Sequence, residues 1–307
     1  MSNLAIKTVN LSKHFGKRIA VNNLNIEIKK GEIFSLLGTN GAGKTTTIKM
    51  LCCLLQSTSG EAFLNDFQLS KNPEEIKKII GVSPQESAIA EHLTSKENLL
   101  LMGGVFGLSR KESQERAKKL MDLLEIEDRK DQTRKLSGGL QRRLSIAMAL
   151  MSDPEILFLD EPTLGLDPHA RKSVWNYIEK LKKHKTILLT THYLEEADSL
   201  ADHIAIMESG NIIASGTSSS LKELSTKPKS LHIKGTQMSH SILPILNELE
   251  LTSKIENNTL TIEGSHFDVY KIMEILKCQN IEIKSIQMSE PTLDDIFIQL
   301  TGKERVL

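Results

Sequence analysis

The sequence predicts an α/β protein whose core is a parallel β-sheet, with an antiparallel β layer before it, a helical insertion inside it and a small C-terminal α+β domain after it. Three observations support this fold class. Short apolar runs of the buried-strand type alternate with helical patterns through about residue 220. Helical patterns follow one another without a strand-like run at about residues 86–152. A polar stretch then precedes a shorter alternation of strands and helices.

The elements of the first part are expected in the following order. The alternating stretch from Leu4 to Ile28 predicts an antiparallel hairpin layer. Core strands are expected at Ile33–Leu37, Ile79–Val82, Ile156–Leu159, Thr186–Thr190 and Ile204–Met207. Helices are expected at Ser95–Val105, Lys111–Leu124, Arg142–Met151 and Ala170–Leu181.

A Ser/Thr/Lys/Pro-rich stretch, Ser215 to Ser230, predicts a linker. We therefore expect one domain over residues 1–222, with its helical insertion at about 86–152, and an accessory domain over residues 228–307. In the accessory domain, strands are expected at Ser230–Lys234, Thr259–Glu263 and Ile281–Gln287, and helices at Ile242–Leu249 and Val269–Lys277.

Composition places the chain among ordinary globular proteins. Its 39 Lys and Arg residues balance 39 Asp and Glu residues, so charge gives no general reason to bind nucleic acid or an anionic membrane surface. No apolar run approaches the roughly 18 to 20 residues that span a bilayer, and the N-terminus lacks the plan of a signal peptide. Cys52, Cys53 and Cys278 show no CxxC spacing and are interpreted as reduced thiols. We expect a cytoplasmic protein that does not bind nucleic acid.

A glycine-rich segment follows the first core strand and begins a helical pattern. It consists of Gly38, Thr39, Asn40, Gly41, Ala42, Gly43, Lys44, Thr45 and Thr46, which match GxxxxGK[ST] in the strand-to-helix context that this pattern requires. Glycines allow backbone N–H groups to surround phosphate oxygens, and the helix N-terminus adds partial positive charge. Lys44 would bind the β- and γ-phosphates, Thr45 a magnesium ion and Thr46 the α-phosphate. The segment predicts a nucleotide-binding loop in a phosphate-loop NTPase core.

Two adjacent acids end another predicted strand. The apolar run Ile156–Leu159 is followed directly by Asp160 and Glu161. A buried strand does not readily end in two carboxylates unless something compensates their charge. Mg²⁺ held through water by Asp160 would supply that compensation, and Glu161 would then polarise the attacking water. A simple turn at Pro162 would explain the proline but not the acid pair.

A second glycine-rich motif makes the chain resemble a known family. Leu136, Ser137, Gly138 and Gly139 match the start of the LSGGQ signature of ATP-binding-cassette (ABC) ATPases, the nucleotide-binding subunits of ABC transporters. Leu140 departs from the usual glutamine. A Ser-Gly-Gly tripeptide alone is a common helix N-cap, but here it stands in order between the phosphate loop and the acid pair.

Four further residues stand in the order that this family has. The resemblance implies that Phe15 stacks on adenine, where family members often have Tyr, and that Gln85 senses magnesium where the helical insertion begins. It also implies that Asp167 belongs to a loop that crosses a dimer interface, and that His192 contacts the γ-phosphate. Read alone, Phe15 would be a core residue and His192 a structural histidine.

The resemblance also implies a mechanism. Two cassettes pack head to tail, and each ATP with its Mg²⁺ lies between the phosphate loop of one and Ser137–Gly139 of the other. Glu161 is expected to act as general base, with His192 and Gln85 completing the catalytic group. The expected Mg²⁺ ligands are Thr45, Gln85 and, through water, Asp160. Because the chain carries one copy of each motif, we expect a homodimer or a pair with another cassette.

The end of the chain narrows the resemblance. The run Glu290–Phe297, followed by Leu300–Gly302, resembles the tail of drug-, sodium- and nodulation-factor-type exporter ATPases. The same residues also fit a helix capped by Thr292 with acids in its first turn. We expect an exporter ATPase that powers a separate integral-membrane permease from the inner face of the cell membrane, with the transported substrate left open.

Three alternatives share part of this pattern. An importer subunit would carry the same ATP motifs, and only the tail argues against it. A soluble ABC ATPase acting on ribosomes or DNA usually has two cassettes in one chain or a long coiled-coil interruption, and the sequence has neither. A GTPase would need an NKxD-type motif to read guanine, which the sequence lacks, and it would give the LSGG segment no role.

Overall fold

The computed structural model describes residues 3–302, except residues 87, 183, 237, 239–241, 248–250, 265–266 and 280. The chain forms two compact units, Met1–Ser218 and Ser219–Leu307. The boundary lies inside the stretch that the sequence predicts as a linker. The first unit contains two sheets and two hydrophobic cores, and the second unit contains one of each.

A six-stranded sheet with the order β11-β10-β4-β9-β8-β7 forms the centre of the first unit. Its strands are β4 (Ile33–Leu37), β7 (Ile80–Ser83), β8 (Ile156–Asp160), β9 (Thr186–Thr191), β10 (His203–Glu208) and β11 (Asn211–Gly216). The first five are parallel to one another and confirm the five predicted core strands, whereas β11 pairs antiparallel with β10. The strand predicted from Ile79 begins one residue later, because Ile79 is still part of the preceding helix.

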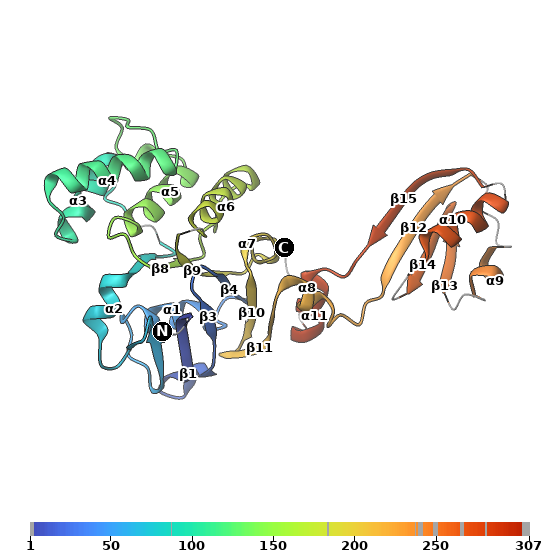
Figure 1. The fold of residues 1–307 in the computed structure, drawn as a ribbon, viewed down its shortest axis with the longest axis horizontal. Coiled ribbons are helices and arrows are strands. Elements are labelled where there is room, and N and C mark those ends of the chain that lie inside the picture. Colours follow the sequence, from blue (N-terminus) through green and yellow to red (C-terminus); the bar gives the residue numbers. More distant parts are fainter. Residues whose placement is uncertain are drawn as a thin grey trace. The chain divides into compact units, whose positions relative to one another are not determined.

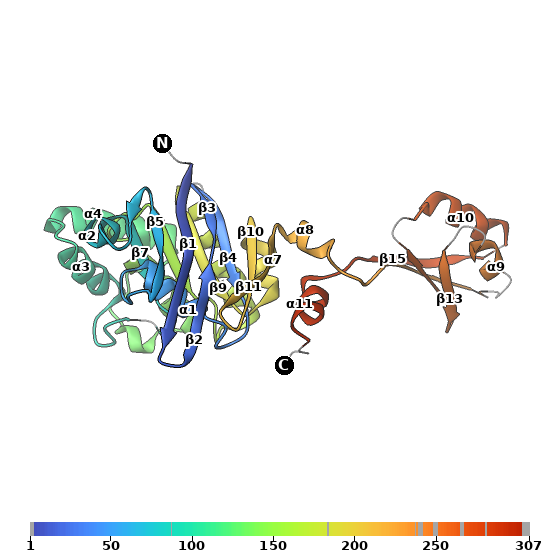
Figure 2. The same ribbon diagram turned by 90° about the horizontal axis from the view of Figure 1, so that it is seen from below.

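An antiparallel layer lies beside this sheet, with the long strand β1 crossing the first unit in Figure 2. Its strands are β1 (Leu4–Phe15), β2 (Arg18–Leu24), β3 (Glu27–Lys29), β5 (Ser59–Leu64) and β6 (Phe67–Gln68). The predicted hairpin layer is confirmed, but β5 and β6 were not predicted. Gly60 allows β5 to approach β1: its φ is +77°, and a Cβ there would lie 2.1 Å from the carbonyl oxygen of Asn10.

The helices of the first unit include the insertion between β7 and β8, whose members α3, α4 and α5 stand together in Figure 1. The helices are α1 (Lys44–Leu51), α2 (Pro73–Ile79), α3 (Ser95–Val105), α4 (Arg110–Leu123), the short 3₁₀ helix η1 (Thr133–Lys135), α5 (Gly138–Ala149), α6 (Pro168–Lys182) and α7 (Leu194–Leu200). Helix α5 begins four residues before the predicted Arg142, because Ser137 caps it and two glycines form its first turn. None of the described helices is both long and apolar enough to cross a membrane.

Strands β4, β8 and β9 of the central sheet divide their side chains between two cores. In β8, Ile156 and Phe158 enter the core on the side of the antiparallel layer, whereas Leu157 and Leu159 enter the core lined by helices α3–α6. Successive side chains of a strand point to opposite faces, so a sheet covered on both faces needs apolar residues at every position. This is why the core strands appear in the sequence as continuous apolar runs.

The second unit contains a four-stranded antiparallel sheet with the order β13-β14-β12-β15. Its elements are β12 (Lys229–Gly235), α9 (Ile242–Asn247), β13 (Thr252–Glu256), β14 (Thr259–Gly264), α10 (Val269–Cys278), β15 (Ile283–Ser289) and α11 (Leu293–Thr301). Strand β13 was not predicted. The last two residues of the predicted helix Ile242–Leu249 lie outside the described residues.

The structure tests two further expectations, the linker at Ser215–Ser230 and the capped helix in the tail. The predicted linker contains the end of β11, the short helix α8 (Ser218–Lys222) and the start of β12, so most of it is regular structure. Serines favour helix starts, and Leu221 in α8 is buried. In the tail, Thr292 and Asp295 form a capping box at α11, as the acids of its first turn indicated.

The two-core arrangement makes Phe158 a sensitive test of the fold. Replacing it with alanine should lower the free energy of unfolding of the first unit by about 3–5 kcal/mol, because a fully buried ring would leave a cavity. Val105→Ala, at a position 69% exposed on α3, is the control and should change stability by less than about 0.5 kcal/mol. Chemical denaturation of both variants provides the measurement, and equal losses would contradict the assignment of Phe158 to the core.

Candidate nucleotide site

The phosphate loop joins β4 to α1 and needs glycine at two close approaches. Gly43 has φ +111°, and a Cβ there would lie 2.4 Å from the carbonyl oxygen of Ala20. At Gly38, a Cβ would lie 2.3 Å from the carbonyl oxygen of Met207. Both clashes involve backbone atoms of neighbouring strands, so the loop fits its place only with these glycines. No described side chain caps the N-terminus of α1, which leaves its first amides available for an anion.

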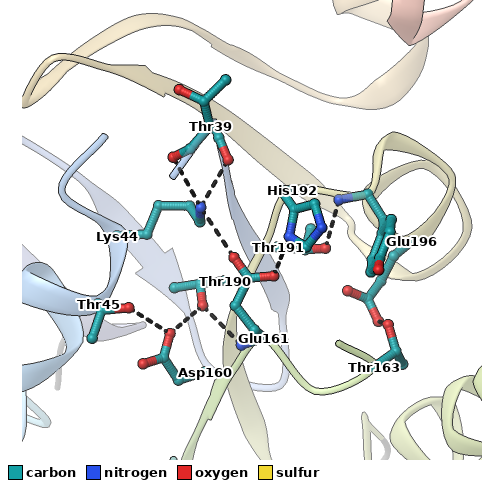
Figure 3. A network of polar contacts seen from close by, with 12 residues as sticks. Thr39, Lys44, Thr45, Asp160, Glu161, Thr163, Thr190, Thr191, His192 and Glu196 are labelled. Carbon is teal, nitrogen blue, oxygen red and sulfur yellow. Dashed lines mark hydrogen bonds and ion pairs between the residues drawn. The ribbon is translucent and has the colours of Figure 1, made fainter. Parts of the chain in front are cut away.

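A polar cavity of about 260 Å³ opens at this loop. It is lined by Arg18, Ala20, Asn40, Gly41, Ala42, Gly43, Lys44, Thr45, Thr46, Gln85 and Glu161. All but Gly38 and Thr39 of the predicted loop residues therefore line one cavity, together with the predicted Gln85 and Glu161. Thr39 lies beside it and contacts Lys44 through its carbonyl oxygen (Figure 3).

Lys44 is a buried cation with several oxygen partners. Its Nζ donates to the carbonyl oxygens of Gly38 at 2.7 Å and Thr39 at 3.2 Å. It also lies 3.0 Å from Oε1 of Glu161, and both side chains are only 5% exposed. Lys44 thus lines the cavity with its charge partly compensated by a carboxylate.

Asp160 lies at the end of β8, where it bridges two threonines. Its Oδ1 accepts hydrogen bonds from Oγ1 of Thr45 at 3.1 Å and from Oγ1 of Thr190 at 2.6 Å. Carboxylate and hydroxyl oxygens are donors that suit Mg²⁺, which also keeps waters and substrate phosphates as ligands. Among the described residues no group of three or more His, Cys, Asp and Glu side chains could hold a metal by itself. The donor set here fits a Mg²⁺ ion that arrives with a nucleotide.

Glu161 turns the chain so that the two acids face different partners. Its φ is +49°, a left-handed conformation that is unfavourable for a non-glycine residue. Its backbone N–H donates to the carbonyl oxygen of Thr190 at 3.1 Å and to the Thr190 hydroxyl at 3.0 Å, and these bonds hold the turn. Asp160 consequently faces Thr45, whereas Glu161 faces Lys44 and His192, as Figure 3 shows.

The Glu161 carboxylate is shared between two basic groups. Its Oε2 lies 2.7 Å from Nδ1 of His192, and its Oε1 contacts Lys44. Burial raises the pKa of Glu161, but the hydrogen bond to His192 and the charge of Lys44 together outweigh burial and hold the pKa below its ordinary value. Glu161 is therefore ionised at neutral pH and can accept a proton once its partners release it.

Phe15 and Gln85 lie at the edge of the site. Gln85 is exposed and lines the cavity just after β7. Phe15 ends β1 with its side chain 50% exposed, and Nζ of Lys13 lies 5.1 Å from its ring centroid. The ring does not line the phosphate cavity, so its predicted contact with adenine stays a prediction.

The signature residues lie outside the cavity of their own chain. Ser137 is the N-cap of α5, where its Oγ accepts a hydrogen bond from the N–H of Leu140 at 3.4 Å. Ser137 and Gly138 are exposed, and neither they nor Gly139 line the phosphate cavity. The N-terminus of α5 is therefore free to meet an anion that another molecule presents.

Asp167 is also exposed and serves as a helix cap. Its Oδ1 accepts the backbone N–H groups of His169 at 2.9 Å and Ala170 at 3.0 Å, at the start of α6. The hydrogen bond from Ala170 lowers the pKa of Asp167, with a smaller contribution from His169. The position of Asp167 on the surface leaves its predicted role in a dimer interface open to test.

Sequence reasoning missed several residues that support the site. Thr190 bridges Asp160 and the backbone of Glu161, and Arg18 lines the cavity. Glu196 of α7 is fully buried and accepts hydrogen bonds from Thr163 at 2.8 Å and from Trp175 at 2.9 Å. Burial raises the pKa of Glu196. A charged residue inside an apolar helix face was the one signal that pointed to Glu196, whereas Thr190 and Arg18 gave none.

Known proteins match both the sequence and the fold. The sequence profile of the family described as "ABC transporter" matches residues 21–164. The chain is 36% identical over 305 residues to the daunorubicin/doxorubicin resistance ATP-binding protein DrrA of Streptomyces peucetius, covering 97% of this chain and 92% of DrrA. It is also 36% identical to the Nod factor export ATP-binding protein I of Bradyrhizobium diazoefficiens, covering 99% of this chain and 98% of that protein.

Among solved structures, the first unit resembles the dimeric post-hydrolysis state of the ATP-binding cassette MJ0796 bound to ADP and Pi. The TM-score is 0.62 at 29% sequence identity, over 69% of this chain and 98% of that one. The parallel sheet, the phosphate loop and the acid pair on β8 are thus found together with full-length sequence similarity to transporter ATPases. The chain belongs to the ATP-binding proteins of ABC transporters and is an ATPase subunit of that family.

Proposed function

We propose that this chain binds ATP with Mg²⁺ as one half of a dimer and that its hydrolysis of ATP drives export through a separate permease. The observation that carries the proposal is the contact of Lys44 and His192 with one buried carboxylate, Glu161, at the wall of the phosphate cavity. This arrangement suits phosphoryl transfer, in which positioning and charge stabilisation account for most of the catalysis.

The pairing of Lys44 with Glu161 suggests how ATP activates the base. The β- and γ-phosphate oxygens compete with Glu161 for the ammonium of Lys44, which lines the cavity. The hydrogen bond with His192 and the charge of Lys44 both lower the pKa of Glu161; once Lys44 binds phosphate, its part of this effect weakens and Glu161 becomes a stronger base. It then takes the proton of the attacking water, while His192 and Gln85 position the γ-phosphate and that water.

Mg²⁺ supplies charge neutralisation for the phosphates when it is bound. Thr45 and, through water, Asp160 are the proposed protein ligands, with Gln85 at the cavity edge as a third. Thr190 orients Asp160 for this role through its 2.6 Å hydrogen bond.

A second copy of the chain completes the site in this proposal. The Ser137–Gly139 end of α5 is exposed and does not line its own cavity, so its amides are available to a γ-phosphate held by another subunit. The dimeric cassette structures among the relatives support the pairing. Asp167, exposed at the start of α6, would lie at the interface.

The permease is proposed to dock at an apolar groove of about 330 Å³ between α3 and the central sheet. Met102, Phe106, Ile80 and Met148 are among its lining residues. Two apolar residues at this groove, Leu54 and Phe106, are 70% and 39% exposed, and a contiguous exposed apolar patch commonly marks an interaction surface. Docking there would attach the chain to the cytoplasmic face of the membrane, next to the segment that carries Gln85.

Export is the proposed direction of transport because the relatives that match nearly the whole chain include one named for Nod factor export and one for drug resistance. The importer alternative shares the site, and the non-transport alternative lacks a membrane partner. Tagging the chain, solubilising membranes gently and identifying the co-purified permease distinguishes these alternatives. Recovery without any integral-membrane protein would favour a non-transport ATPase.

Glu161→Gln tests the proposed base. Turnover should fall by about 10²–10⁴-fold, since a general base typically contributes this much, while ATP binding is kept and an ATP-dependent dimer accumulates. Phosphate release and a sizing column provide the measurements. Lys44→Ala is the companion variant and should lose ATP binding itself; turnover of Glu161→Gln equal to that of the unaltered protein would show that another group is the base.

Thr45→Val tests the proposed Mg²⁺ ligand. It removes a hydroxyl that faces Asp160 and should raise the Mg²⁺ concentration needed for half-maximal hydrolysis by about tenfold or more. Thr47→Val is the matched control, because the one hydrogen bond of the Thr47 hydroxyl among the described residues goes to the carbonyl oxygen of Gly43, the N-cap of the same helix. Titration of Mg²⁺ after EDTA treatment gives the result, and identical titrations for the two variants would speak against a ligand role for Thr45.

Phe106→Glu tests the docking groove. The side chain is 39% exposed and lines the groove, so a charge there should abolish co-purification of the permease while the ATPase activity of the isolated subunit persists. Leu123→Glu is the control, because Leu123 is equally exposed at the end of α4 and does not line the groove. If the permease stays bound to the Phe106→Glu variant, docking must use another surface.

A further inference from the structure

Arg142 is a buried cation that the proposed mechanism does not use. It lies in the second turn of α5 and is only 6% exposed. Its guanidinium donates through Nε to the carbonyl oxygen of Pro162 at 2.9 Å and through Nη2 to the carbonyl oxygen of Asp160 at 2.8 Å. Nη1 donates to the carbonyl oxygen of Pro84 at 2.5 Å and lies 3.5 Å from that of Gln85.

These hydrogen bonds connect three segments that are distant in the sequence. Asp160 and Pro162 flank Glu161, whereas Pro84 directly precedes Gln85. One planar guanidinium therefore joins the helix that carries Ser137 to the peptides on both sides of the proposed base and to the segment of the proposed magnesium sensor. Because Arg presents its donors in a fixed fork, the three segments are held in one relative geometry.

The partners of Arg142 are unusual for a buried cation. In the described part of the chain its hydrogen-bond partners are carbonyl oxygens and not carboxylates. Burial lowers the pKa of Arg142 to about 10, against the opposing charges of Asp160, Glu196 and Glu161. The guanidinium is thus charged at neutral pH, and no carboxylate among residues with described positions contacts it. A buried charge in this setting costs more free energy than an apolar side chain, so simple core packing does not explain it.

We propose that Arg142 is a positioning residue that couples the two ATP sites of the dimer. The proposal rests on the shared-site function above: Ser137 at the start of α5 serves the partner's ATP, whereas Glu161 and Gln85 serve the ATP of their own chain. When a γ-phosphate binds at the N-terminus of α5, it attracts the positive end of the helix dipole, and the helix moves as a rigid element. Arg142 transmits that movement to the carbonyl groups beside Glu161 and Gln85. Hydrolysis in one site thereby depends on occupation of the other.

Arg142→Gln and Arg142→Lys test this coupling. Glutamine removes the fork and the charge, whereas lysine keeps the charge but loses the fork. In Arg142→Gln, kcat should fall by about 10- to 100-fold, because small misplacement of catalytic groups has effects of this size. The Kd of a fluorescent ATP analogue at the phosphate loop should change less than twofold, and the Hill coefficient for ATP hydrolysis should fall toward one. Arg142→Lys should be intermediate in kcat and in the Hill coefficient.

Arg143→Gln is the matched control. The Arg143 guanidinium donates to the carbonyl oxygens of Leu124 and Glu125 and to the hydroxyl of Tyr177, and none of these belongs to the site. This variant should keep the kcat and Hill coefficient of the unaltered protein, even if its thermal stability falls. If Arg142 served stability alone, its variants would behave like the Arg143 control: Tm would fall and the Hill coefficient would stay unchanged.

The outcomes separate this inference from the proposed function. If the unaltered protein does not hydrolyse ATP cooperatively as a dimer, the shared-site function fails. If it does so and Arg142→Gln keeps its kcat and Hill coefficient, only the inference about Arg142 is overturned. Should Arg142→Gln fail to fold, Arg142→Lys decides, because unchanged kcat and cooperativity in that variant would equally overturn the coupling role.

Discussion

The burial of two adjacent carboxylates at the end of one strand is the constraint on which the rest of the site depends. Asp160 and Glu161 are 4% and 5% exposed, and an unpaired buried carboxylate costs on the order of several kcal/mol. The chain turns at Glu161, so that each carboxylate has its own polar partners and its burial is compensated. Asp160 receives two threonine hydroxyls, and Glu161 receives an ammonium and an imidazole. These partners come from the phosphate loop and from strand β9 with the residue directly after it.

In the proposed function, this constraint makes nucleotide binding an exchange of partners. Lys44 already has a carboxylate within 3.0 Å, so phosphate does not enter a vacant positive site but takes over a cation that another anion holds. On this proposal, loss of the Lys44–Glu161 pair would lower the affinity for ATP and release the proposed base in the same step. Lys44 would thereby link binding of the triphosphate to activation of the proposed base.

The sequence predicted those parts of the structure that carry a local pattern. Strands β4, β8 and β9 were predictable because a sheet covered on both faces requires unbroken apolar runs. Strand β13, Thr252–Glu256, has four polar residues in five and resembles a loop, and only pairing with β14 makes it a strand. In the site, the phosphate loop was visible as a motif of consecutive residues. The contact of Arg142 with Pro84 joins residues 58 apart, and no local spacing encodes such a contact.

Strand β8 presents apolar residues on both of its faces, which has a consequence for how the chain finds its native pairing. In most strands, a register shift of one residue exposes apolar side chains to water and is therefore unfavourable. In β8 the same shift would only move apolar side chains from one hydrophobic core to the other. The polar groups at its tip must therefore decide the alignment. A register shift of β8 would break the hydrogen bond between Thr190 and Asp160 and would bury a carboxylate among apolar side chains without that partner. The side chains proposed to act on the nucleotide thus also fix the register of the central strand.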